Sequence, residues 1–193
     1  MKLIFAAAAA AAAIFASMPA NAVSVISTGL KPVQECAIAA GKQDLSDRQM
    51  ASAMGACDAA LKGDLSQNAI AGTLVNRGLL KAAAHDDVAA IADFDAGLSR
   101  DASLSAGYMS RGAVLLRTGR YDAARADFDR AIALGAPDLH IAYFNRGSAE
   151  EAAGNKLAAY HDYRKAQQLA PNFEPASLEL ARFQVVRRVA ANR

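Results

Sequence analysis

A tripeptide that ends in Arg-Gly occurs three times in this chain at nearly constant spacing. It reads Asn76-Arg77-Gly78, Ser110-Arg111-Gly112 and Asn145-Arg146-Gly147, so the glycines are 34 and 35 residues apart. Twelve residues after each glycine comes an alanine, and four residues after that an aromatic residue: Ala90 and Phe94, Ala124 and Phe128, Ala159 and Tyr163. Self-similarity with a period of this length is typical of helical repeat arrays. The middle of the chain is therefore predicted to contain three copies of one unit.

Each unit divides into two helical stretches with a break between them. In the second unit Tyr108, Gly112 and Leu115 share one helical face, Gly119-Arg120 interrupts the pattern, and a second face starts at Ala124. The breaks in the other units are His85-Asp86 and Gly154-Asn155. A glycine inside a helix costs about 1 kcal/mol relative to alanine, so three at equivalent places predict a close contact between the two helices. The predicted packing set is Gly78, Ala90, Phe94, Gly112, Ala124, Phe128, Gly147, Ala159 and Tyr163.

Over residues 71–173 this pattern resembles the tetratricopeptide repeat, in which a glycine, an alanine, an aromatic residue and a proline recur in that order. Pro171 matches the terminal proline of the third unit, and the place of the family's Trp holds Leu74, Tyr108 and Tyr143. The resemblance implies an all-α, right-handed α-α superhelix. The predicted units are residues 68–104, 105–138 and 139–173.

Helical segments are also predicted on both sides of the three units. Residues 32–67 read as a degenerate helical pair, and residues 174–193 as a capping helix and tail with an apolar stripe of Leu178, Ala181, Val185 and Val189. The two cysteines, Cys36 and Cys57, are expected to form a disulfide, with two buried free thiols as the alternative.

The first residues have the features of a secretory signal peptide. Lys2 precedes a mostly Ala run from Leu3 to Ser17, and Ala20-Asn21-Ala22 supplies the small residues of a cleavage site. The run is shorter than the ~20 residues of a spanning helix. Cleavage is expected after Ala22, followed by a flexible lead at 23–31. The mature protein is then expected in the periplasm, with no stable membrane insertion.

Charged residues recur with the same period as the glycines. Arg77, Arg111 and Arg146 precede the glycines, while Asp93, Asp127 and Asp162 precede the aromatic residues. Arginine favours carboxylate partners because its planar fork forms two parallel hydrogen bonds. We expect a ladder of ion pairs within or between the units. The alternative is a basic groove that presents three arginines to an acidic ligand.

The sequence lacks the motifs of catalysis and of cofactor binding. The three histidines and two cysteines have no metal-type spacing, and neither a glycine-rich phosphate loop nor a GxSxG turn occurs. A net charge of +2 gives no reason to expect nucleic acid as a partner. We expect no enzymatic activity, no cofactor and no metal.

The resemblance implies that the first helices of the units line a concave wall that binds a peptide segment of another protein. Carried over from the family, the wall consists of Val75, Asn76, Leu79, Met109, Ser110, Ala113, Phe144, Asn145 and Ser148, with Arg117 and Glu151 near its edge. The lysine and asparagine cluster of a carboxylate clamp is not present. The sequence favours a non-enzymatic adaptor in the cell envelope. The alternative is a structural or assembly subunit that associates, with itself or a complex, through its convex face or cap helix.

Overall fold

The computed structural model describes residues 31–42 and 44–191, and side chains as far as Phe183. The signal peptide and residues 23–30 of the predicted lead lie outside these residues, whereas Lys31, the last residue of that lead, begins helix α2. The described part is helical and contains no strand, as the sequence predicts. The helices are α2 (Lys31–Ala40), α3 (Asp47–Lys62), α4 (Gln67–Ala83), α5 (Asp87–Arg100), α6 (Ser105–Arg117), α7 (Tyr121–Ala133), α8 (Leu139–Ala152), α9 (Lys156–Leu169) and α10 (Glu174–Ala191).

Local sequence signals set where these helices begin and end. Ser46 begins α3 with a capping box, in which its backbone N–H donates to Gln49. Ser66 and Asp86 accept the N–H groups of Ala69 and Ala89 at the starts of α4 and α5. Between the helices of a pair, Gly119 and Gly154 have φ of 78° and 90°, and His85 takes this left-handed conformation at 60°. The structure therefore has its breaks between paired helices at the positions that the sequence predicts.

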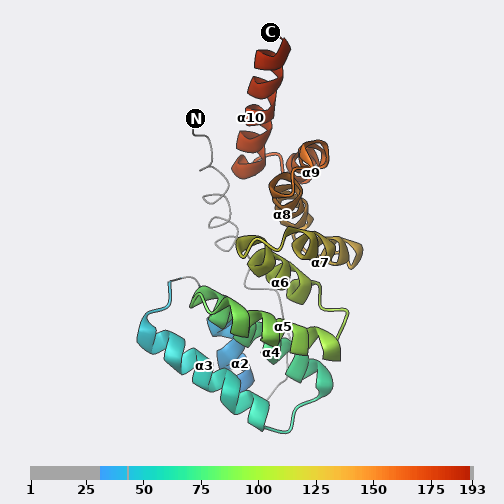
Figure 1. The fold of residues 1–193 in the computed structure, drawn as a ribbon. Coiled ribbons are helices and arrows are strands. Elements are labelled where there is room, and N and C mark those ends of the chain that lie inside the picture. The colour runs from blue at the N-terminus through green and yellow to red at the C-terminus, as the bar shows by residue number, and fades with distance from the viewer. Residues whose placement is uncertain (1–30, 43, 192–193) are drawn as a thin grey trace.

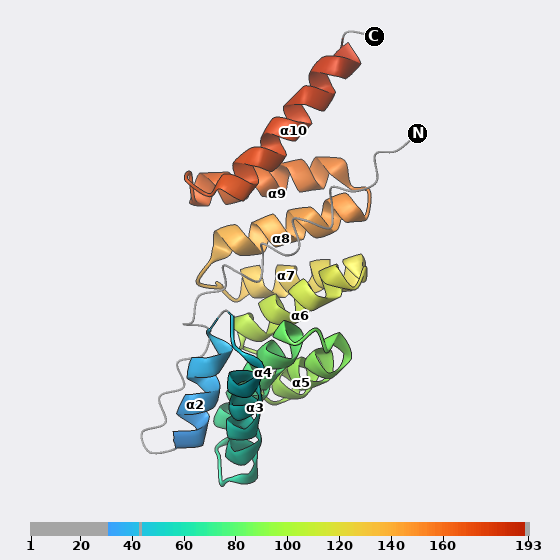
Figure 2. The same ribbon diagram turned by 90° about the vertical axis from the view of Figure 1, so that its left-hand side faces the viewer.

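The helices stack as consecutive pairs along the chain (Figure 1). The pairs of the three units are α4 with α5, α6 with α7, and α8 with α9, and each second helix also contacts the first helix of the next pair. We call the first helix of a pair the A helix and the second the B helix. The A helices α4, α6 and α8 contact one another in sequence, while the B helices are farther apart. The A helices therefore line the inner side of the stack, whose pairs are rotated relative to one another (Figure 2).

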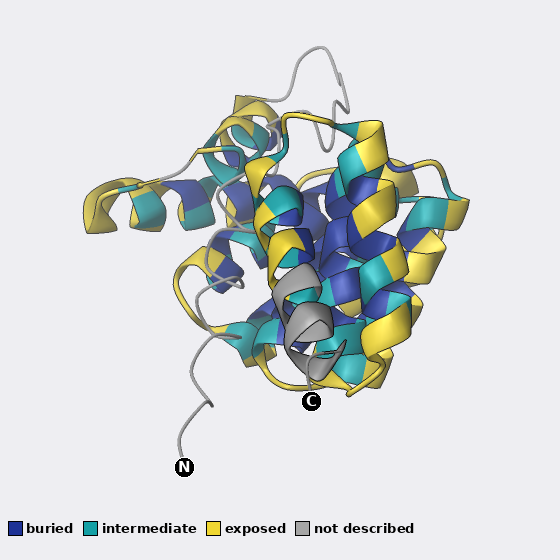
Figure 3. Cartoon of the chain, turned by 90° about the horizontal axis from the view of Figure 1, so that it is seen from above, coloured by how far each residue is buried: buried dark blue, intermediate teal, exposed yellow. Residues whose placement is uncertain are grey.

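Small residues and rings hold each pair together, and buried residues lie between the helices rather than on their outer faces (Figure 3). A Cβ at Gly78 would lie 2.6 Å from Phe94 Cε1, one at Gly112 2.8 Å from Phe128 Cε1, and one at Gly147 2.9 Å from Tyr163 Cε1. The alanines of the predicted packing set, Ala90, Ala124 and Ala159, are fully buried. Only glycine allows each ring to lie against the backbone of the facing helix.

The capping helix α10 packs on α9, but with a different face from the one expected. Leu178 of the predicted stripe is 61% exposed and Ala181 is also exposed, whereas Ala176 and Leu180 are buried. Phe183, half-buried, continues the packed face against Tyr160 and Tyr163. The predicted stripe is wrong at Leu178 and Ala181, because contact with the rings of α9 selects the face that carries Ala176, Leu180 and Phe183. The side chains of Val185 and Val189 lie outside the described residues.

Candidate functional site

Each arginine of the repeated tripeptide makes a bidentate ion pair with the aspartate of its own unit. Arg77 donates through Nε and Nη2 to Asp93 at 2.8 and 2.7 Å. Arg111 bonds Asp127 at 2.8 and 2.7 Å, and Arg146 bonds Asp162 at 2.8 and 2.6 Å, in the same way. The structure therefore places the six residues in three ion pairs that join the A and B helices of each unit.

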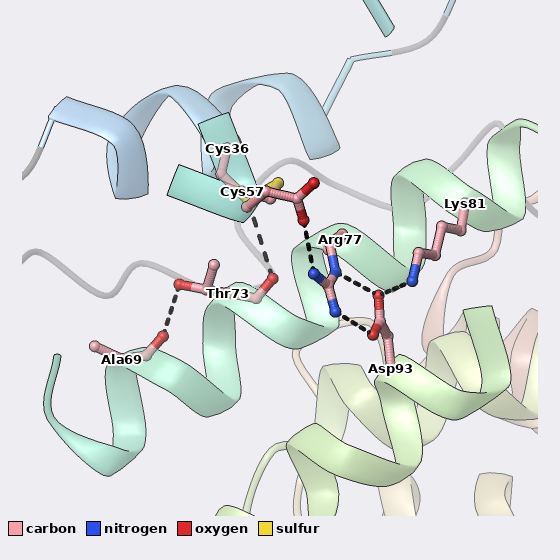
Figure 4. Close-up of a disulfide and its surroundings, with 8 residues drawn as sticks. Cys36, Cys57, Ala69, Thr73, Arg77, Lys81 and Asp93 are labelled. Carbon is pink, nitrogen blue, oxygen red and sulfur yellow. Dashed lines mark hydrogen bonds and ion pairs between the residues drawn. A yellow bond between two sulfur atoms is a disulfide. The ribbon is translucent and has the colours of Figure 1, made fainter. Parts of the chain in front are cut away.

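The third nitrogen of each arginine reaches back to the preceding B helix. Nη1 of Arg77, Arg111 and Arg146 bonds Asp58 of α3, Asp95 of α5 and Asp129 of α7, at 2.7, 2.6 and 2.6 Å respectively. Figure 4 shows Arg77 between the disulfide region and Asp93, with Lys81 on the same carboxylate. In α9 the place of Asp95 and Asp129 is taken by Arg164. Sequence reasoning missed these three aspartates, although two of them recur two residues after Asp93 and Asp127.

Burial and charge shift the pKa values of this ladder in opposite directions. The hydrogen bonds that Arg77 donates to Asp93 raise the pKa of Arg77, against the effect of burial, and those to Asp127 and Asp162 do the same for Arg111 and Arg146. Burial raises the pKa of Asp93, but the hydrogen bonds from Arg77 and Lys81 outweigh burial and leave the pKa below its usual value. Since each guanidinium group is bound to two carboxylates, the three arginines do not form a basic groove that is open to an acidic ligand.

Most of the predicted wall residues are buried rather than exposed on the inner face. Their exposed fractions are at most 7% for Val75, Asn76, Met109, Ser110, Ala113, Phe144 and Asn145. Phe144 packs against Tyr163 and Phe173, at centroid distances of 5.4 and 5.3 Å. This differs from the open wall expected from the sequence, because the apolar side chains among them belong to the hydrophobic core.

The half-buried wall residues are Leu79, Arg117, Ser148 and Glu151, and the last three make contacts within the protein. Arg117 pairs with Asp87 and donates to the Ala82 carbonyl oxygen at 3.1 Å, so it ties α6 to the end of α4. Ser148 donates to the Phe144 carbonyl oxygen at 3.1 Å.

Glu151 anchors the capping helix to the last unit. It accepts hydrogen bonds from Tyr163 Oη at 3.0 Å and from Arg182 of α10 at 2.6 Å. Burial is the main reason why the pKa of Tyr163 is raised. Arg117 and Glu151, expected at the edge of the groove, therefore hold helices together in this structure.

Asn145 differs from its neighbours on α8. The residue is fully buried, and neither its amide oxygen nor its amide nitrogen has a hydrogen-bond partner. A buried polar group without a partner costs about 1–3 kcal/mol. The side chain therefore carries one acceptor and one donor group on an A helix that are closed to solvent and have no partner in the protein.

The described residues also bear on metal binding and on membrane insertion. No group of three or more His, Cys, Asp or Glu side chains there is placed to hold a metal ion. Within the same residues, every helix is too short or too polar to span a bilayer.

The stacked helix pairs define an all-α solenoid of repeated units. Residues 106–134 and 140–173 match the family profile described as tetratricopeptide repeat, and the fold is a solenoid of this type. A search of curated proteins gives no match.

Solved structures share the fold at low sequence identity. The crystal structure of MamA matches with a TM-score of 0.62 and 23% identity, over 72% of this chain and 82% of that chain. A second MamA structure gives 0.59 and 18%, over 72% of each chain. The first TPR of Spaghetti (RPAP3), bound to the HSP90 peptide SRMEEVD, gives 0.58 and 24%, over 62% of this chain and 94% of that chain. Proteins with this repeat generally mediate protein–protein interactions.

Proposed function

We propose that this chain is a non-enzymatic adaptor of the bacterial periplasm that binds a peptide segment of another envelope protein on the inner face of its A helices. The observation that carries the proposal is the unpartnered amide of Asn145 on α8. Because the amide is closed to solvent, a backbone N–H and C=O of a bound peptide would supply the two missing hydrogen bonds only after neighbouring side chains move aside. The peptide bound to the first TPR of Spaghetti supports this kind of ligand.

The proposal implies that Asn145 serves binding at the expense of stability. Replacing it by leucine, which has a similar shape and no polar group, removes the unsatisfied donor and acceptor. We expect Asn145→Leu to leave the free energy of unfolding unchanged or to raise it by about 1 kcal/mol. In the same variant, peptide affinity should fall roughly tenfold or more, since one hydrogen-bonded pair corresponds to about 1.4 kcal/mol.

Peptides for this measurement can be selected by display of a random library on the folded protein and then titrated by calorimetry. Asn68→Leu is the matched control, because Asn68 is an exposed asparagine near the start of α4. The control should bind the selected peptides as the wild type does. Equal affinity of Asn145→Leu and wild type would contradict a ligand at Asn145. Loss of binding only on removal of residues 174–193 would favour the assembly-subunit function.

The periplasmic location rests on residues 1–22, whose pattern is that of a signal peptide. Export of the full chain from a bacterial host should give a mature protein that begins at Val23, as read by N-terminal sequencing of the periplasmic fraction. Recovery of the chain with Met1 in the cytoplasm would contradict this location.

A further inference from the structure

The helical pair before the first unit carries the packing positions of a further repeat. Asp58 of α3 accepts a hydrogen bond from Arg77 just as Asp95 and Asp129 do from the next arginines, which aligns α3 with the B helices. In this alignment Ala53 corresponds to Ala90, and Cys57 to Phe94.

Burial supports the same alignment. Ala53, Cys57 and Ala60 are at most 5% exposed, and they follow one another at the spacing of Ala124, Phe128 and Ala131 in α7. Cys57 therefore occupies the place that an aromatic residue holds in each of the other three B helices. Where the other pairs have a ring against a glycine, this pair has the bond from Cys57 to Cys36 of α2, with the Cα atoms 4.8 Å apart.

We propose that residues 31–62 are a fourth repeat, and that the Cys36–Cys57 disulfide is a redox lock that replaces its glycine–aromatic contact. Closed, the bond holds α2 on α3 and α4. Reduction by a dithiol releases α2, while α4–α9 stay folded. The bond acts in this way whether or not a peptide is bound.

The contacts of α2 explain why the bond matters more to α2 than to α3. Among the described residues, α2 has no ion pair, and its one side-chain polar contact is Cys36 Sγ to the Thr73 carbonyl oxygen at 4.0 Å (Figure 4). A disulfide sulfur has no proton to donate, so this contact adds nothing while the bond is closed. The apolar contacts of α2 come from Val33, Cys36 and small residues such as Ala39 and Ala40. By contrast, α3 is also tied to α4 through Asp58 and Arg77.

Both sulfur-bearing residues are fully buried, so the bond opens only when α2 moves. One thiolate of the dithiol attacks a sulfur of the bond and forms a mixed disulfide. The second thiolate of the dithiol then attacks this mixed disulfide and displaces the protein cysteine. The dithiol is left as a cyclic disulfide, and both protein cysteines become thiols after proton uptake. Two electrons pass from the dithiol to the protein. The cross-link joins two residues that are 21 positions apart in the sequence. In the chain-entropy model, losing it should favour opening by on the order of 100-fold.

Hydrogen exchange of the mature protein, with and without dithiothreitol, tests the lock. We expect the amides of α2 to exchange on the order of 100-fold faster after reduction, with two thiols accessible to alkylation, while α6–α9 exchange as before. Cys36→Ala/Cys57→Ala should behave like the reduced protein whether or not the dithiol is present. Unchanged exchange of α2 after reduction would overturn the proposal, and so would equal loss of protection throughout the array.

A pair of substitutions tests the fourth repeat without redox chemistry. Ala53→Leu places a large side chain on the buried face of α3, and Ala51→Leu places the same side chain on its exposed face. With the disulfide closed, we expect Ala53→Leu to speed exchange in α2 at least tenfold and Ala51→Leu to leave it unchanged. Equal effects of the two variants would show that α3 does not pack as a B helix.

Discussion

At the scale of single residues, the glycines of the repeated tripeptide are set by contact with a ring and not by the helix. Gly112 lies inside α6, where alanine would favour the helix by about 1 kcal/mol. Its Cβ would nevertheless lie 2.8 Å from Cε1 of Phe128, whose ring is fully buried. Gly55 of α3 is also inside a helix, but nothing lies within 4 Å of the place of its Cβ.

This difference gives a paired prediction. Gly112→Ala should lower the free energy of unfolding by about 1–3 kcal/mol, because overpacking outweighs the gain in helix propensity. Gly55→Ala should raise it by about 0.5–1 kcal/mol, since only the propensity changes. Urea denaturation of both variants measures the effect, and a stabilised Gly112→Ala would contradict the ring contact.

The carboxylate of Asp93 predicts a dependence of stability on pH. Its pKa is lowered in the folded protein, so its ion pairs stabilise the fold above the unfolded pKa of about 3.9, and this stabilisation is lost as the pH falls through the folded value. At pH 6 we expect Asp93→Asn to lower the free energy of unfolding by about 2–3 kcal/mol. The difference from wild type should shrink below pH 4.

Asp58→Asn is the control for this experiment, because Asp58 bonds the same arginine but its side chain is 50% exposed. Exposed ion pairs contribute at most about 1 kcal/mol, so this variant should stay close to wild type. Denaturation curves at pH 6 and pH 3 compare the three proteins. A difference between Asp93→Asn and wild type that is as large at pH 3 as at pH 6 would contradict the shift.

Periodicity decided which residue-level features the sequence could reveal. The arginines and their first aspartates recur near every 34 residues, so their pairing was predictable. The complete burial of the Asn145 amide was not, because Asn76 shares its repeat position, and only the packing leaves Asn76 5% exposed and Asn145 fully buried. The place of Cys57 among the aromatic residues also went unrecognised, because a cysteine stands where the ring does in the other units, although Gly41 and Ala53 precede Cys57 at the spacing of the other units.

At the scale of elements, the breaks between helices were predictable and the packed face of α10 was not. The breaks carry glycine or histidine in the left-handed conformation, which is a local signal. The face of α10 depends on a single neighbour, α9, and its apolar residues allow more than one stripe. Contact with Tyr160 and Tyr163 selects the face of α10 that carries Leu180 and Phe183.

Two leucines of α10 separate these faces experimentally. Leu180 is 6% exposed and Leu178 is 61% exposed. Leu180→Ala should lower the free energy of unfolding by about 2–3 kcal/mol, since it removes buried methyl groups and leaves a cavity. Leu178→Ala should change it by less than about 0.5 kcal/mol. Thermal unfolding followed by circular dichroism measures both effects. A larger loss of stability for Leu178→Ala than for Leu180→Ala would support the stripe predicted from the sequence.

At the scale of the whole molecule, the three arginines connect four successive helix pairs. Each guanidinium joins two helices of its own unit and one helix of the unit before it. The ladder therefore runs from α3 to α9 through charge-assisted hydrogen bonds, alongside a core that is divided into clusters. In a linear array, such bonds between neighbours are what couple the stability of one unit to the next.

Arg164 gives this ladder an asymmetric end. A following unit of the same design would bring its own arginine to the place where earlier B helices offer aspartate, and there it would face another cation. The joints before residues 105 and 139 are chemically alike, so a duplicated middle segment would find matching charges on both sides. Among the described B helices, α9 is thus the one that lacks the carboxylate with which α3, α5 and α7 bind the arginine of the following unit.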